Sequence, residues 1–295
     1  SVFYGCTSLT EITIPDSVTS IWSSAFRGCS SLTEITIPDR VTSIGDSAFY
    51  SCTSLTEITI PDSVTNIEGF VFTDTPWLTA KQEENPLVIL NGTLIDGTTC
   101  TGSVTIPDGV TSIAGGAFDS CTGLTAIAIP KSVTSIGDSA FYRCTSLTEI
   151  TIPDSVTSMG DYVFDGCTGL TKVTMPDSIT SIGDYAFRSC TGLTEITIPD
   201  SVTSIGDYAF CDCTGLTKIV IPDSVTSIGD SAFDNCDNLI IYGHTGSFAE
   251  TYAKEHGIQF AAYTFGDLDN SGKVDSTDIF YTMYYVANVA VGNPG

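Results

Sequence analysis

A pattern of 23 residues recurs along this chain, and it restricts the fold more than any other feature of the sequence. One copy runs from Leu32 to Cys52 and combines Leu-Thr-Glu-Ile-Thr-Ile-Pro-Asp, Val-Thr-Ser-Ile, Ala-Phe and a final Cys. Its first leucine recurs in the same frame at Leu9, Leu55, Leu124, Leu147, Leu170, Leu193 and Leu216. Such self-similarity predicts a solenoid, which grows by the addition of units and has no single central core.

Each unit divides into two short extended segments joined by turns. Residues 32–37 alternate between apolar and polar side chains, which is typical of a strand with one buried side. Stacking of units places these strands side by side in a parallel sheet, and Pro38 ends the strand because proline has no backbone donor. Residues 41–44 form the second extended segment. Asp46 or Ser47 is then expected to cap a helical turn that carries residues 48–49.

The unit resembles the 23-residue leucine-rich repeats of the BspA-like class, which occur in bacterial surface proteins. The resemblance lies in Leu-x-x-Ile-x-Ile-Pro, Val-Thr-Ser-Ile-Gly and Ala-Phe-x-x-Cys, and it extends over residues 1 to about 263. It implies a curved right-handed solenoid used in adhesion and protein binding. We therefore expect residues 1–236 to form a leucine-rich-repeat solenoid, mainly β, with stacked short parallel strands and helical turns.

Residues 73–103 depart from the unit. Residues 87–90 and 93–96 flank Asn91-Gly92 and predict a β-hairpin with a type I′ turn. Two interpretations remain open: a projecting element that shapes a binding surface, or a degenerate repeat, which we favour.

Residues 237–263 are expected to cover the open end of the stack. Ser247 and Glu250 predict a capping box at the start of a helix, and Gly257 is expected to end that helix. Residues 258–263 then predict a closing strand.

The charge of the chain excludes several classes of function. The chain has 35 Asp and Glu against 10 Lys and Arg, for a formal net charge of -25. Such a surface repels nucleic acid and anionic membranes. The sequence contains no run of 18 apolar residues, so no membrane span is predicted. Because Ser1 falls within a unit, we expect any targeting segment to lie upstream.

One segment, residues 267–278, contains a metal-binding pattern. Gly272 occupies the sixth place of the loop, where the backbone turns sharply, and the backbone carbonyl of Lys273 serves at the seventh. Side-chain oxygen ligands occupy the first, third, fifth, ninth and twelfth places: Asp267, Asp269, Ser271, Asp275 and Asp278. Because Ca²⁺ prefers such oxygen ligands, we expect it as a cofactor; the alternative is an acidic, solvated tail.

The Asp-terminated loop and the helix expected after it resemble half of a dockerin module, over residues 264–295. Dockerins bind cohesin modules of scaffolding proteins. Ser276 and Thr277 match the Ser/Thr pair that many dockerins use in this contact. The resemblance therefore implies cohesin as a partner.

The cysteines allow three interpretations. Nine of the 11 occur at one repeat position, while Cys100 and Cys211 are extra. Disulfides or a metal site are possible readings, but every unit needs a small core residue and no Cys-x-x-Cys pair is present. We favour a column of buried free thiols, which suits an anaerobic or reducing habitat.

The outward side of the predicted strands varies from unit to unit, at Glu11, Glu34, Glu57, Ala126, Glu149, Lys172, Glu195 and Lys218. We expect an unknown protein ligand to dock at Lys172, Glu195 and Lys218, or at residues 73–97. We expect the chain itself to be a monomer.

Repetition argues against catalysis, because an active site needs unlike groups that converge. We therefore expect a non-catalytic binding scaffold of a secreted or surface-attached bacterial protein, linked to a cohesin-bearing, cellulosome-like assembly. Two alternatives remain: a free-standing adhesin that binds host or neighbouring-cell proteins, or an accessory region of a larger secreted enzyme.

Overall fold

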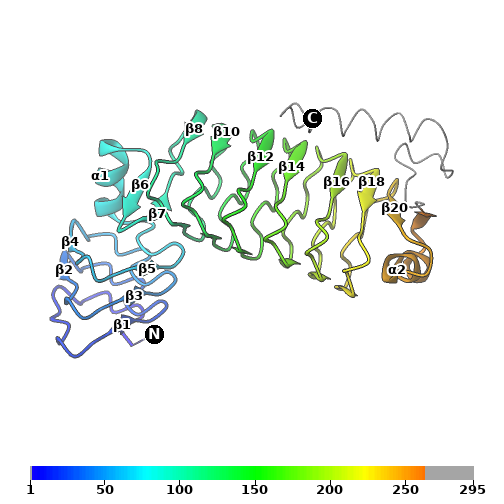
Figure 1. Cartoon of the computed structure of the whole chain (residues 1–295). Helices are drawn as coiled ribbons and strands as arrows, with labels where there is room; N and C mark the ends of the chain where they lie inside the picture. Colours follow the sequence, from blue (N-terminus) through cyan, green and yellow to red (C-terminus); the bar gives the residue numbers. More distant parts are fainter. Residues whose placement is uncertain (1, 263–295) are drawn as a thin grey trace.

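The structure is a computed structural model and describes residues 2–262. Short parallel strands stack along the chain and confirm the predicted solenoid (Figure 1). Every turn of the solenoid has three sides, which we call the strand face, the second face and the turn face.

The strand face is formed by the first extended segment of each unit. Its strands pair in parallel, with Glu34 opposite Glu57 and Glu149 opposite Lys172. They are β2 (Glu34–Thr36), β4 (Glu57–Thr59), β8 (Gly102–Thr105), β10 (Leu124–Ala128), β12 (Glu149–Thr151), β14 (Lys172–Thr174), β16 (Glu195–Thr197), β18 (Lys218–Val220), β20 (Ile240–Gly243) and β21 (Gln259–Ala262).

The second face is formed by the second extended segment of each unit, which is a Ser-Ile pair in most units. Its strands are shorter but also pair in parallel, with Ser43 opposite Asn66. They are β1 (Ser20–Ile21), β3 (Ser43–Ile44), β5 (Asn66–Ile67), β7 (Thr93–Asp96), β9 (Ser112–Ile113), β11 (Ser135–Ile136), β13 (Ser158–Met159), β15 (Ser181–Ile182), β17 (Ser204–Ile205) and β19 (Ser227–Ile228), with β6 (Val88–Leu90) beside β7.

The turn face differs from the helical turn that we expected. The segment is a succession of turns because Ser47 and Ser51 both have φ of 55°, in the left-handed region, which a helix does not allow. The N–H groups of Ser47, Phe49 and Ser51 donate to carbonyls of the next unit at 2.8–2.9 Å. This third set of backbone hydrogen bonds between units replaces the helical bonds.

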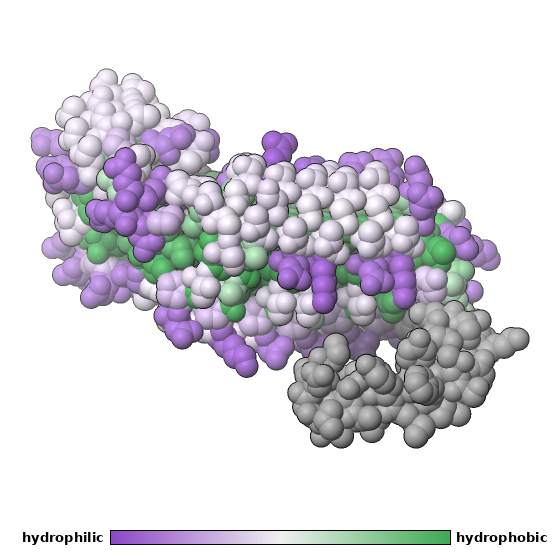
Figure 2. Space-filling view, turned by 90° about the horizontal axis from the view of Figure 1, so that it is seen from above, coloured by the Kyte–Doolittle hydropathy of each residue, from purple (hydrophilic) through white to green (hydrophobic). Residues whose placement is uncertain are grey.

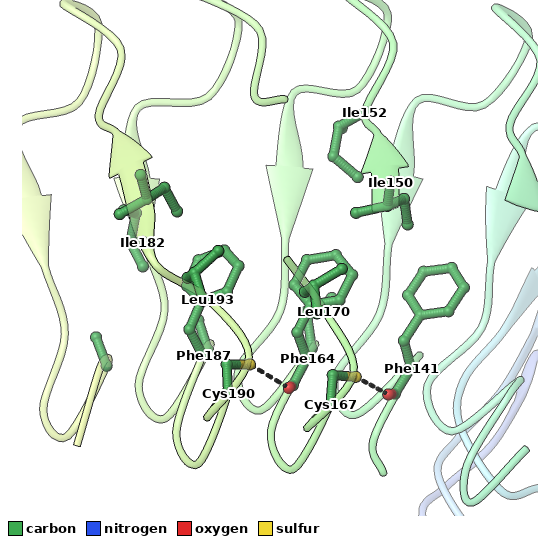
Figure 3. Packing of buried hydrophobic residues seen from close by; sticks show 14 of the residues in the cluster. Phe141, Ile150, Ile152, Phe164, Cys167, Leu170, Ile182, Phe187, Cys190 and Leu193 are labelled. Carbon is green, nitrogen blue, oxygen red and sulfur yellow. Dashed lines mark hydrogen bonds between the residues drawn. The ribbon is translucent and has the colours of Figure 1, made fainter. Parts of the chain in front are cut away.

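Stacked aromatic rings fill the core of the regular units on both sides of residues 73–103. The rings of Phe141, Phe164 and Phe187 lie 5.3–5.5 Å apart between centroids and are nearly parallel (Figure 3). The thiol of Cys167 donates to the carbonyl of Phe141 at 3.0 Å, and the same bond recurs from unit to unit. The cysteines of this repeat position are buried from Cys29 to Cys236, as expected for a column of core thiols, whereas Cys6 of the first unit is exposed.

Residues 73–103 form an internal cap. They contain a helix that we did not predict, α1 (Pro76–Glu84), followed by the predicted hairpin of β6 and β7. Asn91 and Gly92 have φ of 47° and 80°, as a type I′ turn requires. The ring of Trp77 tilts by 54° against Phe72 and ends the first aromatic column. The segment contributes β7 to the second face and β8 to the strand face, as a modified repeat would, and adds α1 at the end of the first aromatic column.

This internal cap separates two blocks of the solenoid. One buried core extends from Ile14 to Val88, and another extends from Leu94 to Ala253. The strands β5 and β7 belong to different sheets, so the second face is interrupted here. Figure 1 shows that the block containing β1 to β5 lies at an angle to the longer block.

A buried carboxylate joins the two parts of the internal cap. Asp96 accepts hydrogen bonds from the side-chain amide of Gln82 at 2.8 Å and from the backbone N–H of Thr98 at 3.2 Å. Burial raises the pKa of Asp96, while the bonds from Gln82 and Thr98 oppose the rise. A raised pKa in the folded chain means that the folded state binds this proton more tightly than the unfolded state does.

We therefore expect the contribution of Asp96 to stability to be largest below its ordinary pKa and to decline as the pH rises through its folded pKa. Asp96→Asn removes this ionisation and keeps an acceptor for Gln82. Melting temperatures of both chains between pH 4 and pH 7 check this, and the loss on going to pH 7 is expected to be smaller in the variant. Parallel curves for the two chains contradict it.

The C-terminal end of the described solenoid has the predicted cap. Helix α2 (Phe248–His256) begins after Ser247, whose hydroxyl accepts from the N–H of Glu250, and ends at Gly257 in the left-handed conformation. The Glu250 carboxylate accepts from the N–H of Gly246, one residue earlier than a standard capping box requires. The ring of Tyr252 meets Phe233 edge-on, so α2 closes the second aromatic column as α1 closes the first.

Candidate interaction surface

The strand face presents one array of outward side chains on a rigid support. Inward residues are nearly the same in each unit, as at Ile35, Ile150 and Ile196, which are 2–4% exposed. Outward residues occupy equivalent backbone positions in successive units but vary in charge, from Glu34 and Glu57 to Lys172. Packing therefore accounts for the inward positions and leaves the outward ones free to differ.

The structure brings Lys172, Glu195 and Lys218, which we predicted as partner-binding residues, together around one groove. The groove has a volume of about 640 Å³ and lies between β14 and β16. Val173, Met175 and Ile196 contribute apolar surface to it. Figure 2 shows a band of apolar residues along the molecule, between weakly polar and charged residues.

The groove lies where the backbone ladder between units is interrupted. The strands β14 and β16 belong to different sheets, and so do β13 and β15 on the second face. Met159, Val173 and Met175 stand here where most other units have isoleucine, and all three are half-buried. We call this junction, between residues 158–174 (β13 and β14) and residues 181–197 (β15 and β16), the seam.

The turn face holds the seam together. Its backbone bonds continue across the seam, from the N–H of Tyr162 to the carbonyl of Asp184 at 2.8 Å. The rings of Tyr162 and Tyr185 stack with centroids 4.6 Å apart. Arg188 donates two hydrogen bonds to the buried carboxylate of Asp165, from Nε to Oδ1 at 3.1 Å and from a terminal nitrogen to Oδ2 at 2.6 Å. We call this ion pair across the seam the clamp.

Sequence reasoning missed this clamp, although a signal exists. Asp165 and Arg188 are 23 residues apart, as are Tyr162 and Tyr185, so each pair occupies one repeat position in adjacent units. Comparison of positions between adjacent units would have paired them.

Two further grooves lie on the strand face. One of about 660 Å³ is lined by Glu11, Asp16 and Glu34 in the first block and is acidic. Another of about 610 Å³ lies between β10 and β12 and includes Lys131 and Glu149. The character of the strand face therefore changes along the molecule from uniformly acidic to mixed charge.

The column of cysteines is suited to packing. Burial raises the pKa of the Cys52 thiol to about 11 and that of Cys236 to about 12. Both thiols therefore stay protonated near neutral pH, and a protonated thiol is a weak nucleophile and a poor metal ligand. This agrees with their role as donors to phenylalanine carbonyls.

The aspartates of the Gly-Asp turns form caps between units. The Asp138 carboxylate accepts from the N–H of Asp161 at 3.0 Å, and Asp161, Asp184 and Asp207 repeat this bond toward the next unit. The pKa of Asp161 is raised because its carboxyl is partly buried, and the hydrogen bond that it accepts from the N–H of Asp184 opposes this rise. Within residues 2–262, no group of three or more His, Cys, Asp or Glu residues is arranged to hold a metal ion.

The predicted calcium ligands Asp267, Asp269, Ser271, Lys273, Asp275 and Asp278 lie outside the described residues, together with Ser276 and Thr277. In the part of the chain that is described, no helix is both long and apolar enough to cross a membrane.

Comparison with known proteins places the repeats in a family. The model of the BspA type leucine rich repeat region matches six copies, over residues 1–125 and 94–216. The chain belongs to the BspA-type leucine-rich-repeat family. The resemblance inferred from the repeat pattern is thereby confirmed for the solenoid.

Solved structures similar to this chain include bacterial leucine-rich-repeat proteins. A leucine-rich repeat protein from Eubacterium ventriosum is 25% identical with a TM-score of 0.50, and the match covers 75% of each chain. One from Bacteroides ovatus is 28% identical, covering 89% of this chain and 80% of the other, with a TM-score of 0.41. A leucine rich cell surface protein from Faecalibacterium prausnitzii is 26% identical, covering 83% and 88%, with a TM-score of 0.29. A search of curated proteins found no significant match.

Proposed function

We propose that this BspA-type chain is a non-catalytic protein-binding scaffold of a secreted or surface-attached bacterial protein. The observation that carries the proposal is the strand face, where side chains of varying charge project from a backbone and core that repeat. An array of this kind presents a wide surface that is already ordered, so a partner pays little conformational entropy on the scaffold side. The cell-surface description of the Faecalibacterium prausnitzii protein accords with this location.

Photo-crosslinking tests the use of the strand face. A benzophenone side chain at Thr174, which is exposed beside the groove, is expected to form protein adducts with bacterial envelope and secreted proteins. The same group at Thr203, which is exposed on the second face, is expected to form few. Equal adducts at both positions contradict a dedicated strand-face site.

We further propose that residues 264–295, the dockerin-like segment, attach the chain to a cohesin-bearing assembly. Asp267, Asp269, Ser271, Asp275 and Asp278 support it, because five oxygen ligands and Gly272 match the calcium-loop spacing. Ca²⁺ would order the loop and so position Ser276 and Thr277 for contact with a cohesin.

Calorimetric titration of the 295-residue chain with Ca²⁺ is expected to show about one site per chain, as one such loop provides. Asp267→Ala removes the first ligand and is expected to weaken Ca²⁺ binding at least tenfold. Asp200→Ala, an exposed aspartate of the solenoid, is the matched control and should leave the titration unchanged. A flat titration of the unaltered chain would exclude the calcium loop, and with it this mode of attachment.

A further inference from the structure

The outward residues of the longer block form a column with an ordered sequence of charges. Each strand contributes one residue to this column, and the strand register places Ala126 beside Glu149, Glu149 beside Lys172, and Glu195 beside Lys218. From β10 to β20 the column reads Ala126, Glu149, Lys172, Glu195, Lys218 and Ile240. The charges thus alternate in sign between two apolar ends.

None of these four charges forms an ion pair among the described residues. The ion pairs formed among residues 2–262 join Lys81 with Glu84, Arg188 with Asp165, and His244 with Asp223, and none of them involves the column. Glu149, Lys172 and Glu195 are exposed. Lys218 is half-buried and lies over the ring of Tyr242, with its ammonium 5.4 Å from the ring centroid. The charged groups therefore remain available to a partner.

When the order of residues in this column is reversed and laid against the original, each charge meets a charge of opposite sign. We infer that the strand face from β10 to β20 packs against the same face of a second copy of this chain. The two-fold axis lies parallel to the strands and passes over the groove between β14 and β16. It brings Glu149 opposite Lys218 of the second copy and Lys172 opposite Glu195 of the second copy, and the two-fold repeats both pairs.

The neighbouring outward column fits the same arrangement by size. It contains Ala128, Thr151, Thr174, Thr197, Val220 and Tyr242. Reversal places the smallest of these, Ala128, opposite the largest, Tyr242, and Thr151 opposite Val220. At the ends of the first column, Ala126 meets Ile240, so apolar residues face one another there as well.

The first block cannot join this contact in the same way. Its column contains Glu11, Glu34 and Glu57, which would face like charges or none at all.

Surface ion pairs contribute little each, and two chains of net charge -25 repel one another. We therefore expect a weak, reversible dimer with a dissociation constant on the order of 0.1 mM, in place of the monomer that the sequence led us to expect.

Sedimentation equilibrium of the 295-residue chain, at about 150 mM salt to screen the net charge, tests the inference. Lys172→Glu with Lys218→Glu makes the column uniformly acidic and is expected to weaken the dimer at least tenfold. Glu149→Lys with Glu195→Lys makes it uniformly basic and is expected to weaken self-association as well. A mixture of these two variants is expected to form a heterodimer at least as tight as the dimer of the unaltered chain.

Lys81→Glu with Lys254→Glu changes the net charge as much as the acidic variant does, but lies away from the column. This control is expected to retain most of the self-association. An equal loss in the control overturns the inference, because net charge alone would then explain it. Failure of the two column variants to associate when mixed also overturns it.

The inference rests on the proposed use of the strand face, but the two can fail separately. Crosslinked adducts at Thr174 with another protein, in a chain that remains monomeric by sedimentation, retain the proposed function and overturn self-association. Adducts only with a second copy support the inference and narrow the proposed function to homotypic binding.

Discussion

Replacement of Phe187 with alanine is expected to lower the free energy of unfolding by about 3–5 kcal/mol, as for other fully buried aromatic residues. The side chain is fully buried and stacks on Phe164 and Phe210 at 5.3 and 5.2 Å. Its loss leaves a cavity in the middle of the aromatic column, and the identical geometry of neighbouring units limits how far the site can collapse. Urea denaturation of both chains measures the change.

Phe248→Ala provides the matched control, because Phe248 is 39% exposed in the C-terminal cap. It is expected to cost less than about 1 kcal/mol. Hydrogen exchange should also show the defect of Phe187→Ala mainly in the longer block, since units of a solenoid contact only their neighbours. An equal loss of protection in residues 20–67 would contradict this independence.

Arg188→Ala is expected to destabilise the chain by roughly 3 kcal/mol, because it leaves a buried carboxylate without its partner. The Asp165 side chain is only 3% exposed, and Arg188 supplies two of its hydrogen bonds. The effect should concentrate at the seam, where β14 and β16 share no ladder and the turn face carries the connection. Denaturant unfolding with hydrogen exchange across residues 172–197 measures both.

Two companion variants separate the clamp from a general loss of arginine. Asp165→Ala with Arg188→Ala removes both charges and is expected to recover part of the stability, since no unpaired buried charge remains. Arg143→Ala removes an exposed arginine about two units upstream of Arg188, which is expected to change stability by less than about 0.5 kcal/mol. If the double variant loses as much stability as Asp165→Ala alone and Arg188→Ala alone lose together, the ion pair is excluded as the cause.

Local chemistry made several elements predictable. Asn91-Gly92 predicts the hairpin because few residues other than Gly and Asn accept a positive φ at both central positions. Ser247 and Gly257 predict α2 because they satisfy its first N–H groups and permit its left-handed end. Helix α1 escaped prediction, although Thr75 and Pro76 form a standard N-cap and first position, because only Trp77 and Leu78 of its nine residues are buried.

The candidate surface was predictable only in part. The varying outward charges of Lys172, Glu195 and Lys218 are visible in the sequence, and the structure places all three around one groove. The groove between them was not, because it depends on the interruption between β14 and β16. The predicted calcium loop at Asp267–Asp278 remains a prediction from spacing alone.

The amino-acid sequence by itself determined the unit, its three sides and the columns of Phe, Cys and Asp. Units of equal length must stack in one register to bury their apolar side, so residues 23 apart become neighbours. The tertiary structure alone decided where this stacking is interrupted: at the internal cap, which sets two blocks at an angle, and at the seam, which is held by Arg188 and Asp165. The positions of these interruptions depend on small differences in packing and hydrogen bonding that add up over three sides of the solenoid. A repeat pattern in the sequence does not predict them, because it describes only what the units share.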